Sequence, residues 1–221
     1  MAGQLIEKTI AFVKETLAGA EGGHDWFHIQ RVYNNSQMIA AQETGRFDAE
    51  VVALGALLHD IADAKFHQGD ETVGPRVART FLEGQGVAEA KIAQVVYIIE
   101  HISFKNSLAK GYTEGDTPLE LQIVRDADRL DAIGAIGIGR AFNYGGFKNR
   151  PMHDPDIAPN LDMDKEAYKK SNAPTINHFY EKLLLLKDRM HTESGKRLAQ
   201  ARHEYMQGFL DQFYAEWDGK K

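Results

Sequence analysis

The chain has 221 residues, of which 43% are hydrophobic, and this is enough apolar material for a self-sufficient core. It contains no cysteine, which excludes disulfides, thiolate metal sites and a cysteine nucleophile, so any metal ion must be held by His, Asp or Glu. The formal net charge of -6 argues against a nucleic-acid polymer as the main partner, although a local cationic pocket for a small phosphorylated ligand is compatible with it. Because no apolar run is long enough to span a membrane and the N-terminus lacks a signal-peptide layout, we expect a cytoplasmic protein.

Apolar residues recur mainly at helical spacing, without sustained two-residue alternation, so the sequence predicts an all-α protein. The expected helices, in chain order, cover residues 4–18, 26–44, 48–61, 73–82, 92–104, 117–142, 175–190 and 192–217. Asp25 and Asp48 are good N-caps, and residues 117–120 have the pattern of a capping box with proline at the first helical position. Residues 143–163, rich in glycine and proline, are predicted to form a long ordered loop.

The third predicted helix ends in a histidine beside an aspartate, His59 and Asp60. An imidazole nitrogen and a carboxylate oxygen from adjacent positions suit a divalent cation that must keep places open for water and substrate. Near the start of the second predicted helix, His24 and His28 are four residues apart and would share one face. Both could therefore face a metal ion.

The order of these residues resembles the HD-domain superfamily, whose metal ligands occur as His, then His-Asp, then a distant Asp. The matching residues here are His28, His59, Asp60 and Asp128. A closer resemblance is to small bacterial HD-domain phosphohydrolases that include nucleoside triphosphate pyrophosphohydrolases, and it covers nearly the whole chain. The segments that carry it are residues 24–28, 58–65, 102–105, 126–134 and 177–183. This resemblance implies a single-domain helical bundle of the HD type.

The four implied ligands would give two neutral imidazoles and two carboxylates, leaving about one or two coordination places for a water that attacks a phosphate. Nitrogen and oxygen donors without sulfur are compatible with Mn, Mg, Co, Ni, Fe or Zn, and the sequence does not choose among these metals. The alternative is a set of buried polar groups satisfied by the protein itself, which would require four costly burials on otherwise apolar helices.

Asp63 follows His59 by four residues and shares its helical face if the helix continues that far. In several HD phosphohydrolases an acidic residue at this offset orients or deprotonates the attacking water, so the resemblance implies a general base here. The alternative is that Asp63 pairs with Lys65 or caps the helix end.

Phosphate groups require cations, and contacts with the substrate are predicted for residues near the ligands. These residues are Lys65, Lys105, Arg129, His24 and His101. Lys148 and Arg150 are further candidate cations, within a glycine-rich tract that lacks a phosphate-loop pattern and is expected to form at most a lid.

Other polar residues receive structural interpretations. Asp126 is expected to face solvent, and Asp131 to support Arg129 or a ligating histidine, because the helix turns both away from Asp128. In the segment 177–183, helical spacing predicts that the apolar residues belong to the core. Four histidines are predicted to lie on the surface: His67, His153, His191 and His203.

The sequence-based hypothesis is a metal-dependent phosphohydrolase acting on a nucleotide, and the resemblance implies attack at the α-phosphorus of a nucleoside or deoxynucleoside triphosphate. The alternatives are a nucleoside 5′-monophosphatase, a cyclic-nucleotide phosphodiesterase, and a nucleotide-binding regulatory module without catalysis. The expected partner is a small nucleotide, with no nucleic-acid polymer and no membrane, and a homo-oligomer is left open. We predict one domain over residues 1–221, with a metal-binding core at about 20–135 and C-terminal helices at 164–218 packed on it.

Overall fold

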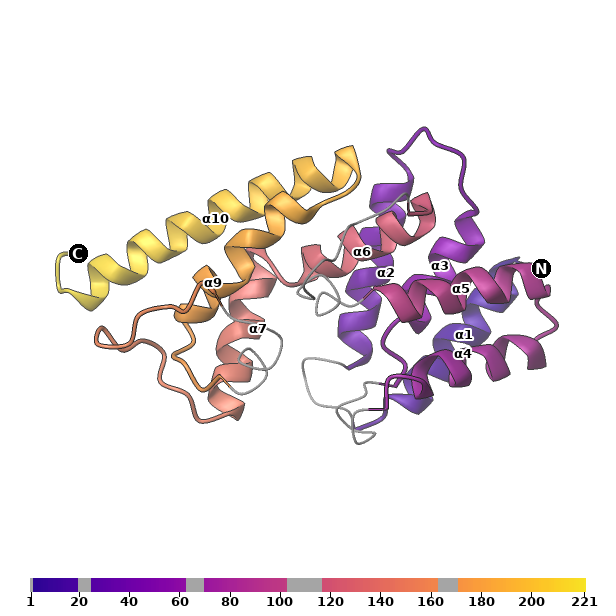
Figure 1. Cartoon of the computed structure of the whole chain (residues 1–221), viewed down its shortest axis with the longest axis horizontal. Coiled ribbons are helices and arrows are strands. Elements are labelled where there is room, and N and C mark those ends of the chain that lie inside the picture. Colours follow the sequence, from indigo (N-terminus) through magenta and orange to yellow (C-terminus); the bar gives the residue numbers. More distant parts are fainter. Residues whose placement is uncertain (1, 20–24, 63–69, 103–116, 163–170) are drawn as a thin grey trace. The chain divides into compact units, whose positions relative to one another are not determined.

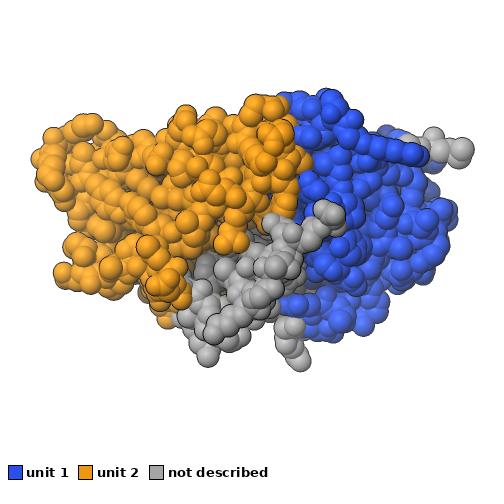
Figure 2. Space-filling view, turned by 45° about the horizontal axis from the view of Figure 1, so that its top comes forward, with its two compact units in different colours: residues 1–128 blue, residues 129–221 orange. Residues whose placement is uncertain are grey.

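The computed structural model describes residues 2–19, 25–62, 70–102, 117–162 and 171–221. Within these ranges the regular structure is helical and contains no β-strand, which confirms the predicted all-α class (Figure 1). The chain divides into two compact units, residues 1–128 and residues 129–221 (Figure 2). In the part of the chain that is described, no helix has both the length and the apolar character needed to cross a membrane.

A buried helix forms the centre of the first unit. The helices of this unit are α1 (Ala2–Thr16), α2 (Trp26–Ala40), α3 (Ala49–Leu58), α4 (Val73–Gly84), α5 (Glu89–His101) and most of α6 (Leu119–Asp131). In α3 every residue from Val51 to Leu58 is buried, and the helix packs against α1, α2 and α5. A helix that is apolar all round is typical of the centre of a bundle. Its C-cap residue is His59, so the most deeply packed helix carries this side chain.

Helix α2 begins as the sequence predicts but ends earlier. Asp25 is its N-cap, and the Asp25 carboxylate accepts a hydrogen bond from the backbone N–H of His28 at 3.0 Å. The predicted extension to Thr44 is wrong, because the helix ends at Ala40. The turn that follows has backbone hydrogen bonds between residues three apart, as in a 3-10 helix. Gly45 lies so close to Leu119 that a Cβ added to Gly45 would be 2.5 Å from the Cδ2 atom of Leu119. The glycine marks this close approach rather than the end of the helix.

Ion pairs and hydrogen bonds of charged side chains connect the start of α3 with α5 and α6. The Asp48 carboxylate accepts hydrogen bonds from the backbone N–H of Glu50 and of Val51, as the predicted N-cap requires. The Lys91 Nζ atom lies 3.0 Å from Asp48 and 2.5 Å from Glu50. The Glu120 carboxylate accepts a hydrogen bond from the backbone N–H of Asp48 at 2.8 Å, a contact that the capping-box pattern does not predict.

Replacing Asp48 with alanine is expected to lower the free energy of unfolding by about 1 kcal/mol, because α3 loses its N-cap. Asp48→Asn keeps the cap and removes only the charge. Burial opposes ionisation, but Lys91 and the backbone N–H groups of Val51 and Glu50 together lower the pKa of Asp48 from 3.8. The charge of Asp48 therefore stabilises the fold fully above its ordinary pKa, and this contribution is lost as the pH falls toward and through the lowered pKa of the folded state.

Urea denaturation at about pH 7 and about pH 3 measures this contribution. The difference in stability between the natural protein and Asp48→Asn should be smaller at the acidic pH. A difference that is equal at both values would show that the carboxylate charge plays no part.

The prediction of a single helix over residues 117–142 is wrong, because this segment forms two helices, α6 and α7 (Gly134–Phe147). Gly134 has a φ of 74°, in the left-handed region that L side chains rarely adopt. A Cβ there would also lie 3.0 Å from the Cβ of Arg202, so both backbone conformation and packing favour glycine. Helix α7 continues to Phe147, so the predicted loop over 143–163 begins later than expected, and residues 148–162 are not helical.

The second unit also departs from a simple helical pattern. Its remaining elements are α9 (Asn177–Glu181), the 3-10 helix η3 (Leu183–Arg189) and α10 (Glu193–Trp217), and α10 packs against α7 and η3. The helix predicted over 175–190 is broken at Lys182, whose φ of -145° and ψ of -58° are not helical. The core residues predicted in this segment are nevertheless buried, with Phe179 fully inaccessible to solvent.

Candidate metal centre

Three of the four predicted ligands meet in the first unit. His28 from α2, His59 at the end of α3 and Asp128 from α6 offer ligand atoms that all lie within 4.8 Å of one another. The Asp128 Oδ1 atom is 3.6 Å from the His28 Nε2 atom and 3.9 Å from the His59 Nε2 atom. Among the described residues, this is the group of His, Asp and Glu side chains that could hold a metal ion.

The protein fixes the orientation of the His59 ring. Its Nδ1 atom lies 2.9 Å from the backbone carbonyl oxygen of Ala56, one turn earlier. Because a carbonyl only accepts, this contact assigns the ring proton to Nδ1 and leaves Nε2, the atom nearer to Asp128, without a proton. Metal-binding histidines typically donate a hydrogen bond from the ring nitrogen that does not bind the metal. This hydrogen bond sets the orientation and the tautomer of the ring.

The distances and burial of the group fit a shared ion. Two ligand atoms that each lie about 2.1 Å from one tetrahedral ion are about 3.4 Å apart, and the observed separations of 3.6 and 3.9 Å are close to this value and too long for hydrogen bonds. His28 and His59 are 2% and 9% exposed, whereas the Asp128 side chain is 36% exposed. The buried imidazoles therefore form the closed side of the group, and the carboxylate lies where solvent reaches it.

Two buried polar side chains position α6, and the sequence analysis did not predict either role. The Asn35 Nδ2 atom of α2 donates to the backbone carbonyl of Ala127 at 3.2 Å, beside Asp128. Arg125 donates from Nε and Nη2 to the carbonyl of His101 at the end of α5, at 3.2 and 2.7 Å. Asn35 follows His28 by seven residues and so shares its helical face, which is the signal that could have identified it.

The variant Asn35→Ala is expected to lose about 1–2 kcal/mol of stability, because it removes a buried hydrogen bond between α2 and α6. Its affinity for Mn²⁺ should fall by about tenfold, since the groups that orient metal ligands typically have effects of this size. The adjacent Asn34 is exposed, so Asn34→Ala is a matched control. Calorimetric titration with Mn²⁺ and urea denaturation measure both quantities, and equal behaviour of the two variants would contradict the positioning role.

Asp60, the fourth predicted ligand, directly follows His59 after the end of α3 and is half-buried. Its carboxylate is not part of the group formed by the described residues His28, His59 and Asp128. The predicted base Asp63 and the predicted substrate contacts His24, Lys65 and Lys105 lie outside the described residues. Their roles remain predictions.

The other two predicted substrate contacts bind to the protein itself. The His101 Nδ1 atom lies 2.8 Å from the carbonyl oxygen of Tyr97, and the two rings stack with centroids 4.0 Å apart. Arg129 is 6% exposed, donates to the carbonyl of Arg189, and has its Nη1 atom 2.9 Å from the His191 Nε2 atom. Arg129 therefore holds the junction between η3 and α10.

Four further polar residues of the sequence analysis are buried or half-buried: Asp126, Asp131, His153 and His203. Asp126 is fully buried, contrary to prediction, because every residue of α6 from Ile123 to Ala127 is buried. The Asp131 carboxylate, predicted to support Arg129 or a ligating histidine, accepts a hydrogen bond from the Arg140 Nη1 atom at 2.6 Å. The half-buried His153 ring packs edge-on against Trp217, with centroids 4.9 Å apart, and burial lowers the pKa of His203.

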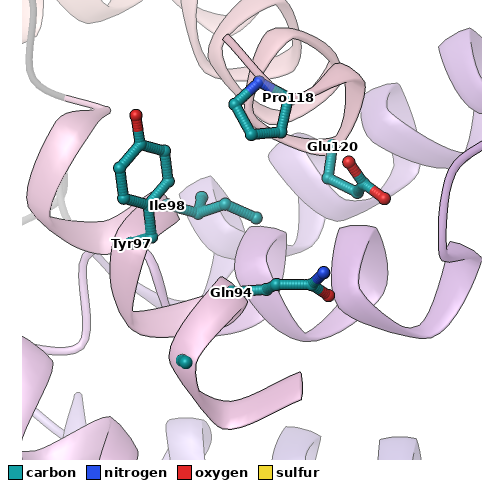
Figure 3. A pocket seen from close by; sticks show the side chains of 6 residues that line it. Gln94, Tyr97, Ile98, Pro118 and Glu120 are labelled. Carbon is teal, nitrogen blue, oxygen red and sulfur yellow. The ribbon is translucent and has the colours of Figure 1, made fainter. Parts of the chain in front are cut away.

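A separate pocket of about 270 Å³ lies in the first unit between α5 and the start of α6 (Figure 3). It is lined by Ala93, Gln94, Tyr97, Ile98, Pro118 and Glu120, whose side chains are mostly apolar. None of these lining residues belongs to the predicted metal or substrate contacts. The pocket is therefore distinct from the metal group.

Known proteins resemble this chain over nearly its whole length. The HD domain family model matches residues 26–133, a segment that contains all three residues of the metal group. The structure of an HD-superfamily hydrolase from Bacillus thuringiensis is 40% identical, covers 99% of both chains and has a TM-score of 0.76. A Lactobacillus plantarum structure is 38% identical, covers 97% of both chains and has a TM-score of 0.81.

Bacillus subtilis YpgQ is 34% identical over 219 residues, which cover 96% of this chain and 94% of YpgQ. The structure of YpgQ in complex with ADP covers 96% of this chain and 97% of that one, with 30% identity and a TM-score of 0.72. Family model, relatives and fold agree, so the chain belongs to the HD-domain superfamily of hydrolases.

Proposed function

We propose that this protein hydrolyses nucleoside or deoxynucleoside triphosphates at the α-phosphorus, releasing a monophosphate and pyrophosphate, with a divalent metal ion as cofactor. The observation that carries the proposal is the group of His28, His59 and Asp128, two buried imidazoles facing a solvent-accessible carboxylate. A divalent ion held by these residues would supply Lewis acidity to a phosphoryl oxygen and increase the acidity of water. The ADP complex of YpgQ supports a nucleotide as the ligand.

The proposed roles follow from chemistry and position. The Ala56 carbonyl keeps the His59 ring in the tautomer that leaves Nε2 free of a proton, and Asp60 is the proposed additional ligand. Asp63 is the proposed base that takes the proton from the attacking water. Lys65, Lys105 and Arg129 are the proposed cations for the phosphate groups, and His24 and His101 are the proposed histidine contacts. The nitrogen and oxygen donors fit Mn, Mg, Co, Ni, Fe or Zn.

A panel of substrates tests this proposal against its alternatives. Nucleoside and deoxynucleoside tri-, mono- and cyclic phosphates are each incubated with Mn²⁺, Mg²⁺ or Co²⁺, and pyrophosphate and orthophosphate are measured separately. Pyrophosphate from triphosphates, without orthophosphate, is the expected result. Orthophosphate from monophosphates would identify a 5′-monophosphatase, and monophosphates from cyclic nucleotides a phosphodiesterase. Binding without any product would identify a regulatory module.

The same reaction in heavy-oxygen water locates the bond that breaks. Attack at the α-phosphorus places the label in the monophosphate, as measured by mass spectrometry of the two products. Label found only in the pyrophosphate would contradict the proposed point of attack.

A further inference from the structure

The turn after α7 holds an arginine in a defined position. The backbone N–H of Arg150 donates to the carbonyl of Gly145 at 2.8 Å, and that of Asn149 donates to Gly146 at 3.0 Å. Asn149 has a φ of 53°. These are the features of a Schellman motif, with asparagine at the position that requires a left-handed backbone. Arg150 is therefore the last residue of a well-formed helix-end motif.

The chain after Arg150 is bound to the start of α9. The backbone N–H of Thr175 donates to the carbonyl of Pro151 at 3.0 Å, and that of Ile176 donates to the carbonyl of Met152 at 2.9 Å. Gly145 packs directly against the Thr175 side chain, with no room for a Cβ. The end of α7 and the start of α9 thus form one framework within the second unit.

The guanidinium of Arg150 uses only part of its hydrogen-bonding capacity. Its Nη2 atom donates to the backbone carbonyl of Ser171, and its Cζ atom lies 5.6 Å from the centroid of the Tyr144 ring. The Nε atom is buried and has no hydrogen-bond partner. A buried N–H of a cation without an acceptor is unfavourable, because the group has lost its water without replacement. The Nε–H of Arg150 therefore lacks a hydrogen-bond acceptor.

His178 lies within electrostatic range of Arg150 and of Lys182. His178 of α9 and Lys182, which follows α9, are both half-buried. Burial, together with the positive charges of Lys182 and Arg150, lowers the pKa of His178 to about 3. Lys182 and Arg150 thus both place positive charge around His178.

We propose that Arg150, His178 and Lys182 form a binding site for a phosphate-type anion, with the buried Nε–H of Arg150 as one of its donors. Arg and Lys supply charge-assisted hydrogen bonds to phosphate oxygens, and the neutral imidazole has one N–H to donate. The simpler explanation, a cation that interacts with the C-terminal end of α7, accounts for the exposed Lys148. It leaves the orphaned Nε of Arg150 unexplained. The site lies in residues 129–221 and requires neither the metal group nor hydrolysis.

Calorimetric titration of the full-length, metal-free protein with inorganic pyrophosphate tests this site. We expect saturable binding at a site that Arg150→Gln weakens by at least about tenfold, since charge-assisted hydrogen bonds to a buried donor are lost. Lys148→Gln removes the same charge two residues away, on an exposed side chain, and should change the affinity by less than about twofold. Lys182→Gln provides a second variant if loss of the Ser171 contact prevents Arg150→Gln from folding.

Two additional comparisons identify what is bound. ADP should lose affinity by the same factor as pyrophosphate in Arg150→Gln, and adenosine should not bind, because the phosphate groups are recognised. His59→Ala should retain pyrophosphate binding, which separates this site from the proposed metal centre. The site is disproved if metal-free protein shows no saturable binding of pyrophosphate. It is also disproved if Lys148→Gln weakens binding as much as Arg150→Gln and Lys182→Gln do, or if His59→Ala abolishes binding.

Discussion

Replacing His59 with alanine is expected to reduce kcat for nucleotide hydrolysis by at least about 10³-fold, because metal assistance contributes several kcal/mol to such reactions. The variant removes the donor whose orientation is fixed by the Ala56 carbonyl, and leaves only His28 and Asp128 of the observed group. Bound metal should fall in parallel with activity. Elemental analysis of the purified protein, alongside steady-state kinetics at saturating Mn²⁺, measures both effects.

The matched control for this variant is His203→Ala, which removes an imidazole from α10 in the second unit. It should keep its metal and its activity, and both variants should retain the helical signal in circular dichroism. Retention of metal and of activity by His59→Ala, at the level of the control, would contradict the assignment of His59 as a ligand.

Asp63→Asn is expected to lower kcat by about 10²–10⁴-fold while the protein keeps its metal, because this is the usual contribution of a general base. The amide resembles the carboxylate in size but cannot accept the proton from the attacking water. Loss of activity without loss of metal indicates a base, whereas loss of both indicates a metal ligand. Steady-state kinetics and elemental analysis of the same preparation make this distinction.

Asp211→Asn, on an exposed position of α10, controls for the removal of one carboxylate. If Asp63→Asn turned over substrate as fast as this control, the base would have to be another residue. If it lost its metal together with its activity, Asp63 would be a ligand.

Local signals in the sequence were sufficient for the starts of α2 and α3, which carry two residues of the metal group. Asp25 and Asp48 cap α2 and α3 as predicted, because an N-cap depends on a few neighbouring residues. The unbroken apolar run of α3 identifies a buried helix, and its last residues deliver His59. The connection of His28 with Asp128, a hundred residues apart, came from the family resemblance rather than from spacing.

Features that depend on tertiary packing were not predictable in this way. The apolar period runs through Gly134, and only its left-handed backbone and the approach of Arg202 show that α6 ends before it. The angle of Asp126 on the helix predicts a position in solvent, but the residues from Ile123 to Ala127 are all buried in the fold. The spacing of Asn35 from His28 places both residues on one face of α2, but the hydrogen-bond partner of Asn35, the carbonyl of Ala127, is set by the packing of α6.

The central claim is that a metal ion bound by His28, His59 and Asp128 enables nucleotide hydrolysis, and one titration tests it most directly. Metal-free protein is titrated with Mn²⁺ in the presence of a deoxynucleoside triphosphate, while bound Mn²⁺ and released pyrophosphate are followed together. We expect no pyrophosphate before addition of metal, and release that rises in proportion to bound Mn²⁺ until the site is saturated. Full activity in the metal-free protein, or saturation with Mn²⁺ without release of pyrophosphate, would contradict it.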